Sequence, residues 1–167
     1  MSSRTIVVGL DESPSSRAAL EWAARFAALT GSVLRAVHVL DWPYGLDDAD
    51  VATPGSAGRL LTHDQIEARY RGRITRVFDE LDPRPDWLMQ FARGEVGTVL
   101  VRQAARAELL VVGTREHVGL ERLLVGSVSH YCFSHAACPV VAVPAPSPWA
   151  SQSSQEAATP LASTSGQ

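Results

Sequence analysis

The segment Val111 to Ser127, "VVGTREHVGLERLLVGS", contains residue types that can bind a phosphate group. It starts as an apolar run, carries glycines at positions 113, 119 and 126, and ends in a Gly-Ser pair. Loops of this kind can wrap a phosphate with backbone N–H groups, and the N-terminus of a following helix favours negative charge. Glu116 places a carboxylate inside the same loop. The segment therefore combines the backbone of a phosphate site with a charge that repels phosphate.

Two further positions have both a structural and a chemical interpretation. Asp11, in "VVGLDES", can shape the start of a helix, or it can present a carboxylate to ribose hydroxyls or a metal ion. Ser127 can cap a helix, or it can bind a phosphate at the helix N-terminus. The residues alone leave both pairs of interpretations open.

The chain contains no lysine, and all 15 of its basic residues are arginine. This excludes a P-loop lysine, a Schiff-base lysine and a lysine general base. An anion site must therefore use backbone N–H groups, helix N-termini, hydroxyls or arginine. His130, Cys132, His135 and Cys138 lie close together in the sequence, but their spacing does not match the usual zinc motifs. We expect core packing at the cysteines instead of a metal site.

Composition predicts a soluble protein with a single domain. The chain has 167 residues, of which 46% are hydrophobic and 20% are charged. Its net charge of -3 argues against a nucleic-acid partner, which needs a concentrated basic face. No apolar run approaches the ~20 residues of a membrane span. The run from Ile6 to Leu10 is too short for a signal-peptide core, so we expect a cytoplasmic protein.

Strand and helix patterns alternate along the chain. Short β-branched runs predict buried strands, and apolar residues at helical spacing predict amphipathic helices. The expected strands are 5–10, 32–40, 86–92, 108–113 and 139–143, and the expected helices are 14–30, 66–81, 96–105 and 128–136. This order predicts an α/β fold, a doubly wound five-stranded parallel sheet flanked by four helices. Ligands of such sheets bind beyond the carboxyl ends of the strands, here beside Asp11, Asp41 and residues 113–126.

One domain is expected over residues 1–144. Within it, residues 41–60 are rich in Pro, Gly and Asp, which predicts a long mobile loop that is either a functional lid or disordered. Residues 145–167 are rich in Ser, Ala, Pro and Gln and predict a disordered tail.

The chain resembles the universal stress protein family from about Thr5 to Val143. The resemblance rests on "IVVGLDES", "AVHVL", "LLVVGT" and "GSVSHYCFSHAACPVVAV". It implies the same fold of five parallel strands and four helices. Members that bind ATP carry Gly, two residues, Gly, nine residues, then Gly-Ser or Gly-Thr. Gly113 and Gly126-Ser127 match this spacing, and the middle glycine is replaced by Glu116.

The resemblance implies ATP as the ligand, with or without Mg²⁺. It implies that Asp11 lies beside the ribose or a metal ion, that the backbone of Val39 meets the adenine edge, and that Gly113 approaches the ribose. The phosphates would contact the start of the last helix. The implied binding residues are Gly9, Leu10, Asp11, Val39, Val112, Gly113, Thr114, Arg115, Glu116, Gly126, Ser127, Val128 and Ser129.

Glu116 is the departure from the family pattern. A carboxylate ~4 Å from a phosphate costs about 4 kcal/mol at an effective dielectric constant of 20, which would take a micromolar ligand to about millimolar. An outward-pointing side chain would remove this cost. A shared Mg²⁺ or the neighbouring Arg115 would offset it. We expect ATP binding to be retained but weakened.

We therefore expect a stress-response protein that binds ATP as a regulatory ligand and acts through a protein partner. The resemblance also implies a homodimer formed through strand 139–143. Two alternatives remain: a dimeric interaction protein with a vestigial pocket, or a slow ATPase or adenylate-forming enzyme. His117 is a lone histidine in the glycine-containing loop, which is a weak candidate for a general base, so we expect at most slow hydrolysis.

Overall fold

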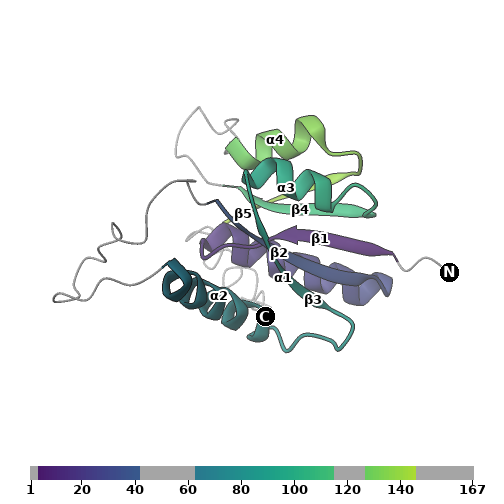
Figure 1. Ribbon diagram of the computed structural model, residues 1–167. Helices are drawn as coiled ribbons and strands as arrows, with labels where there is room; N and C mark the ends of the chain where they lie inside the picture. The colour runs from purple at the N-terminus through teal and green to yellow at the C-terminus, as the bar shows by residue number, and fades with distance from the viewer. Residues whose placement is uncertain (1–3, 42–62, 115–126, 146–167) are drawn as a thin grey trace, which may run out of the picture.

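The computed structural model describes residues 4–41, 63–114 and 127–145, which form a parallel sheet with helices on both faces (Figure 1). The strands are β1 (Thr5–Gly9), β2 (Val33–Leu40), β3 (Leu88–Arg93), β4 (Leu109–Thr114) and β5 (Val140–Pro144). The helices are α1 (Pro14–Thr30), α2 (His63–Asp79), α3 (Val96–Gln103) and α4 (Ser127–His135). None of these helices is long and apolar enough to cross a membrane.

The sheet has the strand order β3-β2-β1-β4-β5, and every neighbouring pair is parallel. The chain proceeds outward from β1 through β2 to β3, and then returns to β4 on the other side of β1. The winding direction therefore reverses between β1 and β4. This is the doubly wound α/β fold predicted from the sequence, and the reversal is the place where such sheets bind ligands.

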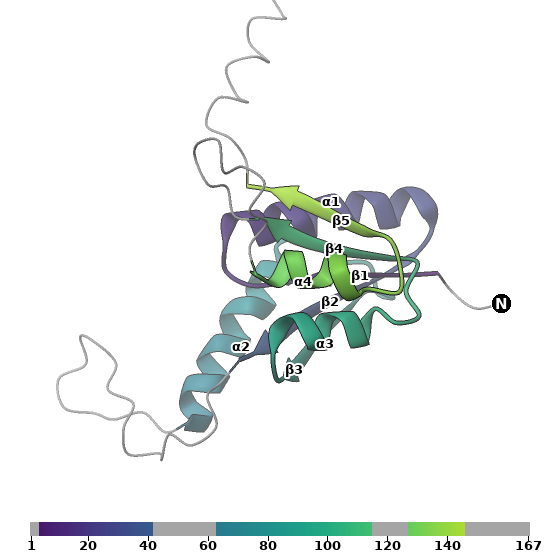
Figure 2. The same ribbon diagram turned by 90° about the horizontal axis from the view of Figure 1, so that it is seen from above.

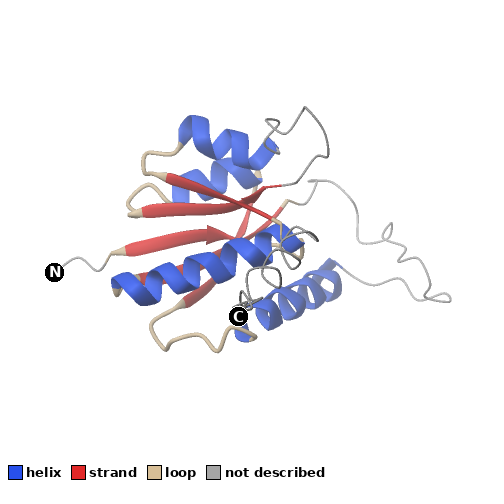
Figure 3. Ribbon diagram, turned by 180° about the vertical axis from the view of Figure 1, so that it is seen from behind, coloured by secondary structure: helices blue, strands red, loops and turns tan. Residues whose placement is uncertain are grey.

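Helices α1 and α2 cover one face of the sheet, and α3 and α4 cover the other (Figures 2 and 3). Each central strand serves both faces because its side chains alternate. In β1, Ile6 and Val8 pack toward α1 and α2, whereas Val7 packs toward α3 and α4. All three are fully buried. The central strands therefore consist almost entirely of apolar residues.

Local signals at both ends of α1 explain its bounds. The hydroxyl oxygen of Ser13 accepts a hydrogen bond from the Ser16 N–H, and Pro14 is the first helical residue. Gly31 ends the helix in the left-handed conformation, with φ of 68°. Its buried face is made of small residues such as Ala19, Ala23 and Ala27, which bring α1 close to the sheet.

The predicted elements all occur, and none of their ends is shifted by more than three residues. Two expectations were wrong in detail. The edge strands are only partly buried, because each has a neighbour on one side alone; Leu88 in β3 is 52% exposed. The helical spacing of Val128, Tyr131, Cys132, His135 and Ala136 predicted one buried face of α4, but His135 is exposed and stacks on Tyr131 with ring centroids 4.1 Å apart. Apart from Asp41 and Ala145, the predicted mobile loop and tail lie outside the described residues.

Candidate functional site

A pocket lies at the carboxyl edge of the sheet, where β1, β2 and β4 end and α1 and α4 begin. The cavity has a volume of about 160 Å³. Nine residues predicted from the sequence line it: Gly9, Leu10, Asp11, Val39, Val112, Gly113, Ser127, Val128 and Ser129. Thr114 ends β4 and is not among the lining residues, while Arg115, Glu116 and Gly126 lie outside the described residues.

Seven lining residues were missed by the sequence analysis: Ser13, Ser15, Ser16, Val37, His38, Val96 and Leu100. The serines follow Asp11 in "DESPSS", and the start of a helix at the end of a central strand was a signal that could have identified them. His38 precedes Val39 in "AVHVL", where a polar residue interrupts an apolar strand. That interruption was also a usable signal.

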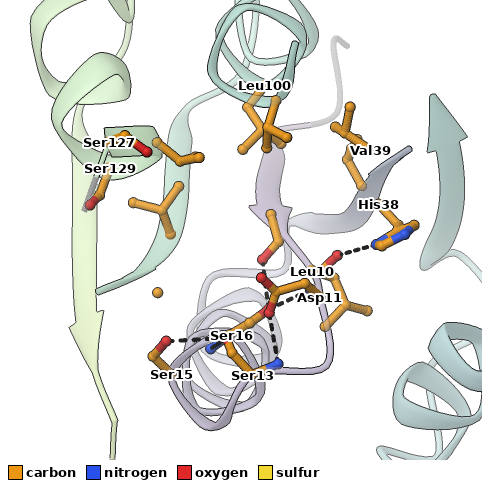
Figure 4. A pocket seen from close by; sticks show the side chains of 16 residues that line it. Leu10, Asp11, Ser13, Ser15, Ser16, His38, Val39, Leu100, Ser127 and Ser129 are labelled. Atoms are coloured by element: carbon orange, nitrogen blue, oxygen red, sulfur yellow. Dashed lines mark hydrogen bonds between the residues drawn. The ribbon is translucent and has the colours of Figure 1, made fainter. Parts of the chain in front are cut away.

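The turn after β1 is held by Asp11, the cap residue Ser13 and Ser16 of α1 (Figure 4). Asp11 Oδ1 accepts a hydrogen bond from the Ser13 N–H at 2.8 Å, and the Asp11 N–H donates to Ser16 Oγ at 2.7 Å. Ser16 Oγ in turn donates to the Gly9 carbonyl oxygen at 3.3 Å. Asp11 therefore shapes the start of the helix, and its exposed carboxylate also lines the pocket. The structural and chemical interpretations of this residue are compatible.

One end of the pocket is formed where β2 extends past β1. Leu10 and Val39 are buried there, and the side chain of His38 is only 9% exposed. His38 Nδ1 lies 2.7 Å from the carbonyl oxygen of Leu10. Its ring meets Phe91 of β3 edge-on, with centroids 5.8 Å apart. Three strands thus fix the shape of this end of the pocket.

The other end of the pocket is formed by the N-terminus of α4. Figure 4 places Ser127 and Ser129 across the pocket from His38 and Val39. Ser127 is exposed and is the first residue of the helix, so it does not occupy the cap position considered from the sequence. Ser129 is buried. N–H groups in the first turn of a helix are available to an anion, and the helix dipole adds a partial positive charge.

An apolar wall joins the two ends of the pocket. Val96 and Leu100 come from α3, whose start is fixed by Glu95. The Glu95 carboxylate accepts hydrogen bonds from the N–H groups of Gly97 and Thr98. Hydrogen bonds from the hydroxyl and amide of Thr98 lower the pKa of Glu95, so this cap is charged at neutral pH. The apolar wall is suited to a flat ring or a sugar face.

Gly113 has a packing role that the sequence analysis did not foresee. A Cβ atom added at this position would lie 2.6 Å from the carbonyl carbon of Ser15 and 2.7 Å from the nitrogen of Ser16. The end of β4 therefore touches the backbone of α1, and only glycine allows this contact. The requirement for glycine here follows from the approach of two elements, whatever the pocket holds.

The described lining residues hold one carboxylate, that of Asp11, and no arginine. Among these lining residues, an anionic ligand would therefore rely on N–H groups and hydroxyls, in agreement with the absence of lysine from the chain. The described residues contain no cluster of three His, Cys, Asp or Glu side chains that could hold a metal ion. Cys132 is fully buried in the core beneath α4, as predicted, and burial raises the pKa of its thiol to about 11.

Comparisons with known proteins agree with the fold. The sequence model of the universal stress protein family matches residues 2–144. A universal stress protein from Burkholderia pseudomallei is 26% identical, with a TM-score of 0.57 over 84% of this chain and 96% of that one. A universal stress protein solved in complex with cAMP is 24% identical, with a TM-score of 0.58 over 87% of this chain and 100% of that one.

A universal stress protein from Archaeoglobus fulgidus, solved in complex with dAMP, is 19% identical, with a TM-score of 0.55 over 86% of this chain and 99% of that one. No curated protein sequence matches the chain. The family match covers nearly the whole of the described fold, including the pocket and the strands that form it. The chain belongs to the universal stress protein family.

Proposed function

We propose that this protein is a cytoplasmic stress-response protein that binds ATP as a regulatory ligand. The observation that carries the proposal is the polarity of the pocket. Backbone groups at the end of β2 lie at one end, and the N-terminus of α4 with its serines lies at the other. An adenine nucleotide has the same polarity, with a hydrogen-bonding base at one end and phosphates at the other.

The proposed placement puts the adenine against the backbone of Val39 and the ribose near Asp11 and Gly113. The phosphates meet Ser127, Ser129 and the first turn of α4. Structures of relatives with bound cAMP and dAMP support an adenine nucleotide as the ligand class. The absence of lysine supports phosphate binding through N–H groups and hydroxyls, with or without Mg²⁺.

We propose regulation in place of catalysis because the described lining residues do not include a nucleophile paired with a general base. His38 uses Nδ1 to hold the Leu10 carbonyl, so it is committed to a structural hydrogen bond. Bound nucleotide would instead change the affinity for a protein partner, since a ligand stabilises the conformation that it prefers.

Two experiments test the proposed ligand. Mass spectrometry of the protein purified under native conditions should find a co-purified adenine nucleotide. Calorimetric titration of nucleotide-free protein with ATP, AMP and adenosine, with and without Mg²⁺, should show heat for each ligand and the highest affinity for ATP. Absence of binding at millimolar ATP in both conditions would mean that the pocket is vestigial, and the interaction-protein alternative would then replace this proposal.

We also propose a homodimer formed through β5, which lies at the edge of the sheet. The Leu110 N–H donates to the Pro139 carbonyl, so Pro139, Val141 and Val143 direct their backbone groups toward β4. Val140 and Ala142 direct theirs outward, to the open edge. An uncovered apolar edge favours pairing with a second chain.

The alternation of β5 gives a matched pair of proline variants. Val141→Pro removes an N–H that faces β4 and should destabilise the monomer by about 3 kcal/mol. Ala142→Pro removes an outward N–H and should weaken the dimer with a smaller effect on the monomer. Light scattering with thermal unfolding separates the two effects. A monomeric mass for the parent protein at micromolar concentration would contradict the dimer.

A further inference from the structure

The ladder between β1 and β2 ends beside the pocket. Its register runs from Thr5 opposite Val33 to Gly9 opposite Val37. The Leu10 N–H donates to the Val37 carbonyl at 2.9 Å, so the backbone groups of Val37 face β1. In a parallel ladder both groups of one residue face the same neighbour, and successive residues alternate. Val39 therefore faces the side of β1 as well.

A second hydrogen bond fixes the same alternation from the other side. The Gly94 N–H donates to the Leu40 carbonyl at 3.3 Å, so Leu40 faces β3. Val39, the residue before it, must then face β1, which has already ended. The N–H and C=O of Val39 consequently point past the last paired residue of β1, at the wall of the pocket.

The ladder would continue if the Val39 N–H reached the carbonyl of Leu10. That carbonyl accepts a hydrogen bond from His38 Nδ1 at 2.7 Å instead (Figure 4). Since a carbonyl oxygen can only accept, Nδ1 carries the proton. The ring is buried and packs against Phe91, so it cannot easily turn away. A buried side chain thus occupies the acceptor at which the next ladder bond would form.

We propose that His38 is a positioning residue: by engaging the carbonyl of Leu10, it keeps the N–H and C=O of Val39 directed at the pocket, where they select the base. This inference rests on the proposed nucleotide function. The Val39 groups offer one donor and one acceptor side by side. Adenine matches them with its N1 acceptor and N6 donor. Hypoxanthine and guanine reverse both, with an N1–H donor and an O6 acceptor, and are disfavoured.

The selection can be tested with two variants of nearly equal shape. Asn places its side-chain nitrogen close to the position of Nδ1 and can still donate to the Leu10 carbonyl. Leu has the same branching and the same number of side-chain heavy atoms as Asn, but it has no hydrogen-bond donor. Both His38→Asn and His38→Leu lose the ring contact with Phe91. Any difference between them therefore reports the hydrogen bond and not the packing.

The readout is the ratio of the affinities for ATP and inosine triphosphate, which differ in the hydrogen bonds of the base. Calorimetric titration of the full chain should show a clear preference for ATP in the parent and in His38→Asn. In His38→Leu the preference should fall about tenfold, through weaker ATP binding, because the Val39 groups are no longer fixed. An unchanged ratio in His38→Leu, at reduced thermal stability, would show that His38 has only a structural role and would overturn the proposal.

A measurement without nucleotide separates this inference from the proposed function. In the free parent protein, amide hydrogen exchange followed by NMR should be at least about tenfold faster at Val39 than at Val37. Equal protection at the two amides would show that the ladder continues and would overturn the proposal. If Val39 exchanges rapidly in the parent and is protected in His38→Leu, but the parent binds neither nucleotide, the proposed function fails while the role of His38 in ending the ladder is supported.

Discussion

At the amino edge of the sheet, side-chain pairs and backbone pairs form hydrogen bonds that close the connections, whereas at the carboxyl edge three strands end beside a pocket. The hydroxyl of Ser32 is fully buried at the amino edge and bonds Thr30 Oγ1 at 2.8 Å and Glu108 Oε2 at 3.3 Å. The Glu108 N–H donates to the Thr5 carbonyl at 2.8 Å. These bonds tie the starts of the strands to one another, and none of these four residues lines the pocket described above.

At the carboxyl edge the polar groups have two roles. Asp11 and Ser16 hold the turn after β1, while Val39 and the first turn of α4 face the pocket. The difference follows from topology, because the winding reverses between β1 and β4, and such a reversal leaves a crevice at the carboxyl ends of the strands. Substitutions at the amino edge should therefore change the free energy of unfolding alone, and those at the carboxyl edge should change nucleotide affinity.

The largest combined effect on stability and affinity is expected at Gly113, where the two roles of the carboxyl edge coincide. Gly113→Ala puts a Cβ atom within 2.8 Å of backbone atoms of Ser15 and Ser16, so β4 or α1 must move. We expect a loss of about 3 kcal/mol in the free energy of unfolding and a large loss of ATP affinity. Thermal unfolding and calorimetry measure the two effects.

Gly72→Ala is the matched control for this substitution. Gly72 lies within α2, and nothing lies within 4 Å of an added Cβ atom. Alanine should stabilise the helix by up to about 1 kcal/mol and leave ATP affinity unchanged. Parent-like stability and affinity in Gly113→Ala would contradict the close contact between β4 and α1.

A charge at the start of α4 should separate affinity from stability. Ser127→Asp places a carboxylate where a helix N-terminus favours negative charge, so the melting temperature should hold or rise. The same carboxylate near the phosphates should weaken ATP by about 4 kcal/mol at 4 Å, roughly a thousandfold. Adenosine, which has no phosphate, should bind as it does to the parent. Equal losses for ATP and adenosine would place the phosphates elsewhere.

Glu116 lies outside the described residues, and its substitution is expected to raise ATP affinity, the opposite of the effect of Ser127→Asp. If residues 113–126 hold the phosphates as proposed, Glu116→Gly removes a like charge beside them, and ATP affinity should rise by about tenfold to several hundredfold, or ~1.4–4 kcal/mol. The gain should shrink for adenosine. A loss of ATP affinity that appears only with Mg²⁺ would identify the carboxylate as a metal ligand and reject the repulsion argument.

The smallest effect is expected at the amino edge. Ser32→Ala removes the buried hydroxyl that Thr30 and Glu108 contact, and should lower the free energy of unfolding by about 1 kcal/mol. ATP affinity should stay at the parent value, measured in the same calorimeter. A fall in ATP affinity without a fall in the free energy of unfolding would contradict the claim that only the carboxyl edge affects nucleotide binding.

The fold could be predicted from the sequence because its signals are local. Ser13-Pro14 and Gly31 fix the ends of α1, and apolar β-branched runs identify the central strands. The neighbouring loops then identified the carboxyl edge as the candidate site. Partial exposure of β3 could not be predicted as easily, since it depends on which strands lie at the edge.

The finer parts of the site depend on contacts between distant residues. The packing need for glycine at 113 arises from the backbone of Ser15 and Ser16, about a hundred residues earlier in the chain. The hydrogen bond of His38 to Leu10 crosses from one strand to the next. Neither contact can be recognised from the spacing of residues in the sequence. The hydrophobic pattern therefore predicted where the pocket lies but not why it has its shape.

The most direct test of the account is an NMR titration of the full chain with ATP, followed through backbone amides. We predict saturable shifts at Val39 and Gly113, and at Ser127 to Ser129, at both ends of the pocket. The amides of Ser32 and Glu108 at the amino edge should stay in place. The absence of shifts at millimolar ATP, or shifts confined to residues away from the carboxyl edge, would contradict the proposal that this pocket binds an adenine nucleotide.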